Sequence, residues 1–191
     1  ICQKLYFMNL RWMLVAMATL LFISPLSAQI AFWQTYLGGR AFDKGEKLIV
    51  QKDGGIMVAG ETYSTDDQFD GNHSTDSDII LFKYSTQGSF FWKSYIGGSG
   101  MEDLGDLRET ADGGFIITGT TNSVDGDLNA NNGGNDILVA KLDFKGRVEW
   151  IRNLGTKYDD RGLAVAELPS GDFLVGGEIG APKPVGEELP H

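Results

Sequence analysis

The chain has 191 residues, with 16 Lys and Arg against 26 Asp and Glu, and its formal net charge at pH 7 is −10. This acidic balance disfavours a nucleic-acid partner, because that binding depends on cationic side chains that contact phosphate. It favours a solvated acidic surface and raises the local concentration of divalent cations. The single cysteine, Cys2, precedes Met8, which we take as the start of translation. A disulfide scaffold is therefore excluded, and packing must supply the stability.

The N-terminal residues 1–28 have the pattern of a secretory signal peptide. Arg11 gives a short basic region, an apolar run extends from Trp12 to Ile23, and small residues lead to Ala28. The alternative is a membrane anchor, but the run is shorter than the about 20 residues that a spanning helix needs. We expect cleavage after Ala28, a mature chain that starts at Gln29 with a net charge of −12, and a secreted or cell-surface protein that leaves the membrane after cleavage.

After this segment the sequence repeats itself, and Trp33, Trp92 and Trp150 head three copies at nearly equal intervals. A Gly-Gly or Gly-Thr turn follows each Trp, and a second turn of the type Asp-Gly-Gly or Ser-Gly-Asp comes later in each copy, at 53–55, 112–114 and 170–172. A period of roughly 58 residues, as found here, is typical of an array or propeller of one supersecondary unit. The repeat region covers residues 29–180, with copies at 33–91, 92–149 and 150–180.

Each copy predicts short strands and almost no helix. In the first copy, residues 48–51 and 56–59 flank the turn at 53–55 and predict a hairpin. Residues 79–84 and 90–95 supply a third and a fourth strand. The nearly continuous apolar third strand indicates burial on both faces, as in stacked sheets. The second copy has the same four strands, at residues 107–110, 115–118, 137–142 and 148–153.

We therefore predict an all-β fold, a partial β-propeller-like array of four-stranded antiparallel blades with two complete repeats and half of a third. The third copy ends its pattern after Gly177, and residues 181–191 form an off-pattern tail. Propellers typically close with 4–8 blades. The chain is thus predicted to be a fragment of a longer protein, with assembly through unclosed blade edges as the alternative. The positions expected to be buried are Leu48, Val58, Leu81, Leu107, Ile117 and Val139.

A tryptophan at a fixed position of every copy needs a role. Trp92 and Trp150 begin or flank the fourth strand, where a large ring fills the gap between neighbouring sheets. The alternative is a surface on which a sugar ring stacks. We predict packing as the main role.

The later half of the unit reads Asp-x4-Lys-x4-Gly-x3-Trp, first from Asp78 to Trp92 and again from Asp136 to Trp150. Together with the two glycine turns, this pattern resembles the tandem repeats of secreted bacterial β-propeller repeat proteins, over residues 33 to about 178. The resemblance implies a secreted or cell-surface protein of Gram-negative bacteria. Many such proteins are exported by type IX secretion, through a C-terminal sorting domain.

A second resemblance concerns the turn before the last tryptophan. Leu142-Asp143-x-x-Gly146-x-x-x-Trp150 is similar to the tryptophan-docking turn of quinoprotein dehydrogenase propellers, with one residue fewer between Asp and Gly. The docking turn is structural in those enzymes. The resemblance therefore implies blade geometry and neither a quinone cofactor nor a catalytic residue.

The acidic loop before the third strand of the second copy is the stretch most suggestive of chemistry. Calcium takes 6–8 oxygen ligands, and an EF-type loop places them at positions 1, 3, 5, 7, 9 and 12. This loop has alternating oxygen-bearing side chains, but Ala130 replaces the expected Gly, and Asp replaces Glu at the last position. The alternative is a plain polar loop, because Asp, Asn and Gly favour loops. The predicted calcium ligands are Asp125, Asp127, Asn129, Asn131 and Asp136.

No catalytic constellation is recognisable in the sequence. Its histidines, His73 and His191, allow no Ser-His-Asp or metal-hydrolase arrangement. The glycines at 97–100 precede no lysine-bearing helix, so they form no phosphate-binding motif. We expect an exported binding or scaffold module, with surface glycans or proteins as partners and no cofactor apart from calcium. The alternative is the propeller part of a secreted hydrolase or lyase whose catalytic residues lie outside this chain.

Overall fold

The computed structural model describes residues 33–73 and 76–182 of the chain. The predicted signal peptide, residues 1–28, and residues 183–191 of the predicted tail lie outside the described residues. Within the described part the protein is all-β, as predicted. Its helical structure there is a single 3-10 turn, η1 (Asp67–Phe69).

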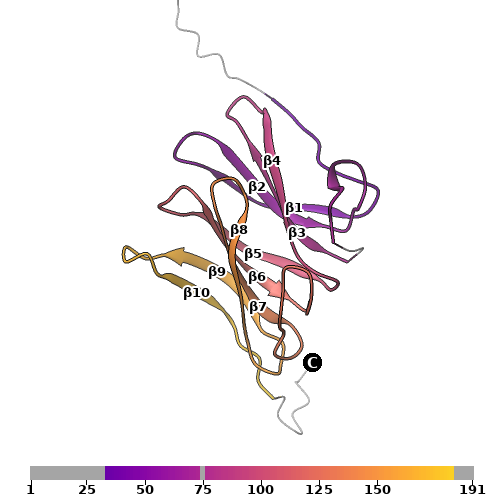
Figure 1. The fold of residues 1–191 in the computed structure, drawn as a ribbon, viewed down its shortest axis with the longest axis vertical. Helices are drawn as coiled ribbons and strands as arrows, with labels where there is room; N and C mark the ends of the chain where they lie inside the picture. The colour runs from indigo at the N-terminus through magenta and orange to yellow at the C-terminus, as the bar shows by residue number, and fades with distance from the viewer. Residues whose placement is uncertain (1–32, 74–75, 183–191) are drawn as a thin grey trace, which may run out of the picture. The chain divides into compact units, whose positions relative to one another are not determined.

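Ten antiparallel strands form three open sheets, named A, B and C here, in which the strands pair in chain order (Figure 1). Sheets A and B have four strands each, as predicted for the first two copies, and sheet C has two within the described residues. Sheet A consists of β1 (Asp43–Val50), β2 (Ile56–Thr62), β3 (Asp78–Tyr84) and β4 (Phe90–Ile96). Sheet B consists of β5 (Glu102–Glu109), β6 (Phe115–Thr121), β7 (Asp136–Leu142) and β8 (Val148–Leu154). Sheet C consists of β9 (Arg161–Glu167) and β10 (Phe173–Glu178).

The repeated glycine turns close the first hairpin of each sheet. In sheet A, the Gln51 N–H donates to the Gly55 carbonyl at 2.8 Å, and the Gly54 N–H donates to the Gln51 carbonyl at 2.9 Å. Gly54 has a φ of 84°, in the left-handed region that glycine adopts without strain. The same conformation recurs in the other two sheets, at Gly113 and Gly171.

The lysine of the repeated motif ties the third strand to this turn. Lys141 on β7 is buried, and its Nζ lies 2.9 Å from Asp112 Oδ2 in the turn between β5 and β6. Lys83 on β3 pairs with Asp53 in the same way, at 3.8 Å. Hydrogen bonds from the Thr110 hydroxyl and from Lys141 hold the pKa of Asp112 below its usual range. The spacing from Asp to Lys in the motif therefore serves the closure of the hairpin.

Two apolar cores lie between the stacked sheets. The third strands of sheets A and B are buried along all seven residues, which confirms the burial predicted from their apolar runs. Each large apolar side chain so buried contributes about 1.5–3 kcal/mol. The core between sheets A and B includes Met57, Leu81, Ile96, Leu107, Phe115, Ile117 and Leu138. The core between sheets B and C includes Ile116, Ile137, Val139 and Val165.

Of the six positions expected to be buried, Leu81, Leu107, Ile117 and Val139 are buried. Val58 is partly buried, and the prediction for Leu48 is wrong, because that side chain is 64% exposed. Leu48 pairs with Val58 on the face of sheet A that points away from sheet B. Part of that face is covered by η1 and by the segment that precedes β1. The side chain of Leu48 on β1 stays exposed to solvent. The sequence shows an apolar residue in a strand, but it does not show which face has a neighbour.

The tryptophan rings lie between the sheets, as predicted. Trp92 on β4 of sheet A contacts Phe115 on β6 of sheet B, with the ring centroids 6.0 Å apart. Trp150 on β8 of sheet B contacts Phe173 on β10 of sheet C, at 5.7 Å. Each ring therefore extends from the last strand of one sheet to the second strand of the next.

The glycine of the repeated motif leaves space for the tryptophan that heads its own copy. A Cβ atom on Gly146 would lie 2.4 Å from the Trp92 ring, and one on Gly88 would lie 2.6 Å from the Trp33 ring. Both glycines also have a left-handed backbone, with φ of 78° and 82°. A side chain at Gly146 would collide with a ring from sheet A, and one at Gly88 would collide with the segment that precedes β1.

We predict that Gly146→Ala destabilises the protein more than Gly113→Ala, which is its matched control. Both glycines have a positive φ, so either change costs about 1 kcal/mol in backbone strain. A Cβ at Gly113 would meet no atom within 4 Å, whereas the one at Gly146 meets the indole ring. That collision should cost a further ~1–3 kcal/mol. Urea unfolding of the two variants measures the difference, and equal losses would contradict the inter-sheet role of this contact.

Candidate functional site

The acidic loop between β6 and β7 is bound to the turn that follows sheet A. Asp125 Oδ1 accepts the Ser99 N–H at 2.7 Å, and Asp127 Oδ2 accepts the Gly97 N–H at 3.3 Å. Two of the five predicted calcium ligands therefore hold backbone amides of the preceding turn. Their carboxylates anchor the loop between consecutive sheets.

The other three predicted ligands do different things. Asn131 Oδ1 accepts the Gly133 N–H at 2.7 Å, and Asp136 Oδ2 accepts the Asn132 N–H at 2.7 Å. Asn129 is exposed. Among the described residues, no group of three or more His, Cys, Asp or Glu side chains has an arrangement that holds a metal ion. Calcium at this loop stays a prediction.

The same loop and β8 enclose a surface depression with a volume of about 520 Å³. The Asn153 amide donates to the Ala130 carbonyl and so joins strand to loop. The Arg152 guanidinium lies 5.9 Å from the centroid of the half-buried Trp150 ring. Carboxylate, amide and guanidinium groups thus surround an aromatic side chain. The polar residues that line the depression are Asp127, Asn129, Asn132, Glu149, Arg152 and Asn153.

A second depression, of about 230 Å³, lies where the first strands β1, β5 and β9 of the three sheets meet. Its lining carries charges of both signs, including Lys44, Glu46 and Asp103. Glu61 Oε1 accepts the Leu104 N–H at 3.1 Å, which ties sheet A to sheet B. Lys44 Nζ lies 2.5 Å from Glu46 Oε1 and 3.8 Å from Glu61 Oε2.

Glu61 has an unusual titration at this depression. Burial is the main cause that raises its pKa, to about 7. The negative charges of Glu46 and Asp103 add to this effect, and the hydrogen bond from Leu104 opposes it. The sequence did not identify Glu61 as a functional candidate. The only available signal was a glutamate at the end of an apolar second strand, where the second copy has Thr120.

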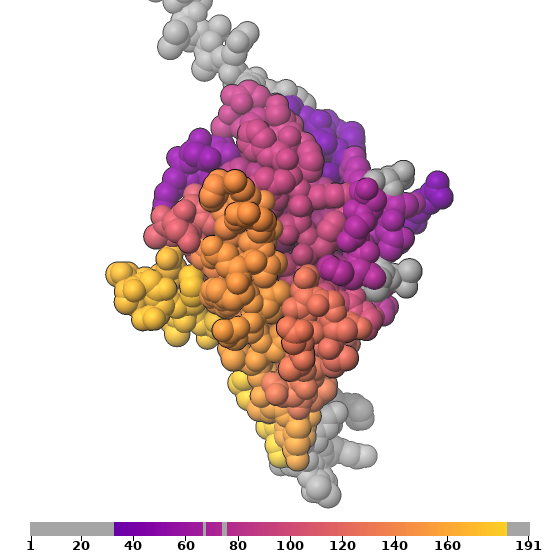
Figure 2. Space-filling view, viewed as in Figure 1, coloured from indigo at the N-terminus to yellow at the C-terminus, as the bar shows by residue number. Residues whose placement is uncertain are grey.

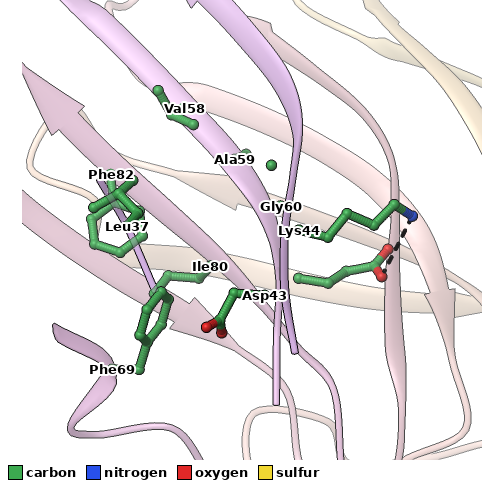
Figure 3. Close-up of a pocket in the computed structure, with 11 residues that line it drawn as sticks. Leu37, Asp43, Lys44, Val58, Ala59, Gly60, Phe69, Ile80 and Phe82 are labelled. Atoms are coloured by element: carbon green, nitrogen blue, oxygen red, sulfur yellow. Dashed lines mark ion pairs between the residues drawn. The ribbon is translucent and has the colours of Figure 1, made fainter. Parts of the chain in front are cut away.

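A third cavity, of about 60 Å³, lies on the face of sheet A that points away from sheet B (Figure 3). Leu37, Phe69 and Phe82 line it, and Asp43 borders it. The Asp43 carboxylate accepts hydrogen bonds from the Gly39 N–H and from the Thr62 and Ser64 hydroxyls. The Lys44 ammonium forms an ion pair with the Glu61 carboxylate, which is marked by a dashed line in Figure 3. The space is small and mostly apolar, so we assign it to packing.

In comparisons with known proteins, no protein-family model and no curated protein matches this chain. No helix within the described part of the chain has the length and apolar character that crossing a membrane requires.

The raised pKa of Glu61 predicts that stability falls as the pH rises. The ordinary pKa of a glutamate is 4.5 here, so between pH 4.5 and about 7 the folded state holds a proton that the unfolded state has lost. The contribution of this proton to the free energy of unfolding is fully present below pH 4.5 and is lost as the pH rises through about 7.

Glu61→Gln mimics the protonated side chain and should remove that loss. Between pH 5 and 8, the free energy of unfolding of the variant should fall less than that of the wild type, by about 1–3 kcal/mol. Urea unfolding at several pH values measures it, and Glu178→Gln on the exposed end of β10 is the control. Parallel pH profiles for wild type and Glu61→Gln would rule out a protonated Glu61.

Proposed function

We propose that the chain is an exported binding or scaffold module whose surface loops recognise glycans. The observation that carries this proposal is the depression between the loop at 127–132 and β8. It combines an aromatic ring with side-chain amides, carboxylates and a guanidinium group. Sugars are recognised by this combination, since their hydroxyls need hydrogen-bond partners and their C–H groups contact apolar surface, here the exposed part of the half-buried Trp150 ring. A surface protein is the alternative partner.

We further propose that the sheets are blades of a partial β-propeller-like array. Three observations support this: the sheets stack in chain order, each uses the same tryptophan contact, and the first strands β1, β5 and β9 meet at one depression. In a propeller the equivalent strands of all blades line a common channel.

Sheet C supports a continuation of this array beyond the described residues. Among the residues that the structure describes, β10 has a strand partner on one edge, whereas its counterparts β2 and β6 have partners on both. Leu174 on β10 is 61% exposed, and the β9–β10 hairpin projects from the surface in yellow in Figure 2. Unpaired edges with apolar residues favour added strands. We propose that the strands of a further repeat, or a second chain, cover this edge.

A second candidate function is the propeller part of a secreted hydrolase or lyase, in a form that differs from the sequence-based alternative because one catalytic carboxyl group lies in this chain. Glu61 favours it, because a carboxyl group that keeps its proton near neutral pH can act as a general acid. If the full chain cleaves a polysaccharide and Glu61→Gln abolishes that cleavage, the result would support this function. Binding without turnover would support the binding module.

Glycan binding is tested with the double variant Asn129→Ala/Arg152→Ala. Both side chains are exposed and line the depression, so their truncation should weaken binding at least tenfold and leave the fold intact. A glycan array identifies the ligand, and calorimetry measures its affinity for wild type and variant. Gln87→Ala, in the exposed turn between β3 and β4, is the control. No glycan signal, or unchanged affinity in the double variant, would overturn this site.

Export is tested by the mature N-terminus. When the full chain is expressed in a Gram-negative host with intact secretion, mass spectrometry of the exported protein should give Gln29 as the first residue. A product retained in the membrane with Trp12 to Ile23 would contradict the signal peptide.

A further inference from the structure

Two equivalent joints between consecutive sheets contain pairs of buried carboxylates. At the first joint, Asp78 at the start of β3 faces Glu102 at the start of β5. At the second, Asp136 at the start of β7 faces Asp160, the residue before β9. All four residues have a relative exposure of 0%. Both pairs join one repeat to the next.

A backbone hydrogen bond fixes each pair. The Glu102 N–H donates to the Ser77 carbonyl at 2.7 Å, and the Asp160 N–H donates to the Asn135 carbonyl at 2.6 Å. The acceptor is in both cases the residue just before the third-strand Asp. The two acids of each joint are therefore held side by side by the same contact between repeats.

The distances around a turn glycine show how close the carboxylates are. The point where a Cβ atom of Gly97 would be lies 2.3 Å from Asp78 Oδ1 and 2.7 Å from Glu102 Oε2. The corresponding point at Gly155 lies 2.4 Å from Asp136 Oδ1 and 2.6 Å from Asp160 Oδ2. The two oxygens of each joint cannot be further apart than the sum of these distances, about 5 Å.

One buried oxygen of each pair has no hydrogen-bond partner among the described residues. This holds for Asp78 Oδ1 and for Asp136 Oδ1. The other oxygen of the same side chains is bound, by the N–H and ring nitrogen of His73 and by the N–H and amide of Asn132. A buried carboxylate oxygen without a partner is costly. Its recurrence at the same position in two copies indicates a feature of the repeat.

Cationic side chains do not balance these charges. Among the described residues, His73 is the only basic side chain within ion-pair distance of the first pair, and the second pair has none. Each joint thus brings two buried carboxyl groups within about 5 Å of each other and leaves one oxygen of the third-strand Asp without a hydrogen-bond partner. A divalent cation would neutralise the pair and give that oxygen a partner.

We propose that each joint binds a calcium ion between its two carboxylates, bridging Asp78 to Glu102 and Asp136 to Asp160. Calcium lies 2.3–2.6 Å from its oxygen ligands and accepts irregular geometry, so one ion spans two oxygens that are about 5 Å apart at most. Backbone carbonyls and water complete its ligands. These sites use a different set of groups from the acidic loop, with Asp136 as the shared residue, and they do not depend on the proposed glycan binding.

The first experiment uses the full wild-type chain. Calorimetric titration with calcium chloride should give about two sites per chain. By mass action, saturating calcium should raise the melting temperature by roughly 5 °C relative to chelator. Equal melting temperatures in calcium and in chelator, with no heat of binding, would overturn the proposal even if no variant folds.

The second experiment locates the ions. Asp78→Asn and Asp136→Asn keep the shape of the side chain and remove its charge, so each should lower the stoichiometry by one and reduce the gain in melting temperature. Asn129→Ala, in the exposed part of the acidic loop, should keep both sites. Loss of binding in Asn129→Ala alone would place the ion in the loop and overturn the joint sites. A further outcome is that Asp78→Asn and Asp136→Asn are more stable than the wild type, both with and without calcium. This outcome would show that the two carboxyl groups share a proton in place of an ion, and it would also overturn the proposal.

Discussion

The structure depends on one constraint: the third strand of each repeat is apolar on both faces. Every residue of β3 and of β7 is buried, so neither sheet can satisfy its own third strand without a layer on each side. Sheet B has such layers in sheets A and C. Sheet A has sheet B on one face. Its other face packs against η1 and against the segment before β1, which carries Trp33. Stability is therefore shared between neighbouring repeats.

The repeated motif has one structural task for each of its residues. The Asp lies close to a carboxylate of the next repeat, and the Lys binds the turn of the first hairpin in its own sheet. Gly146 makes room for Trp92 of the sheet before it, and the Trp extends to the sheet after it. Three of these four tasks concern the contact between sheets. A pattern of this kind can therefore recur with constant spacing while the loops around it vary.

The sequence was sufficient for the features that its local pattern determines. The strand order, the glycine turns at Gly54 and Gly113, and the packing role of Trp92 all follow from spacing and residue type. The exposure of Leu48 and the raised pKa of Glu61 could not be predicted, because both depend on which neighbour lies across a sheet face. The pairing of Asp78 with Glu102 was missed for the same reason, since the two residues belong to different sheets and lie far apart in the chain.

Within each sheet, every strand pairs with its neighbour in the chain, which has a consequence for how the protein folds. Sheets A and B each form from three successive hairpins, so their contacts are short in sequence and need little loop closure. The apolar cores between sheets join neighbouring sheets, A with B and B with C. Folding can then proceed from one end of the chain to the other, with each finished sheet acting as the template for the next. A chain that emerges N-terminus first would acquire its structure in the order in which it is made.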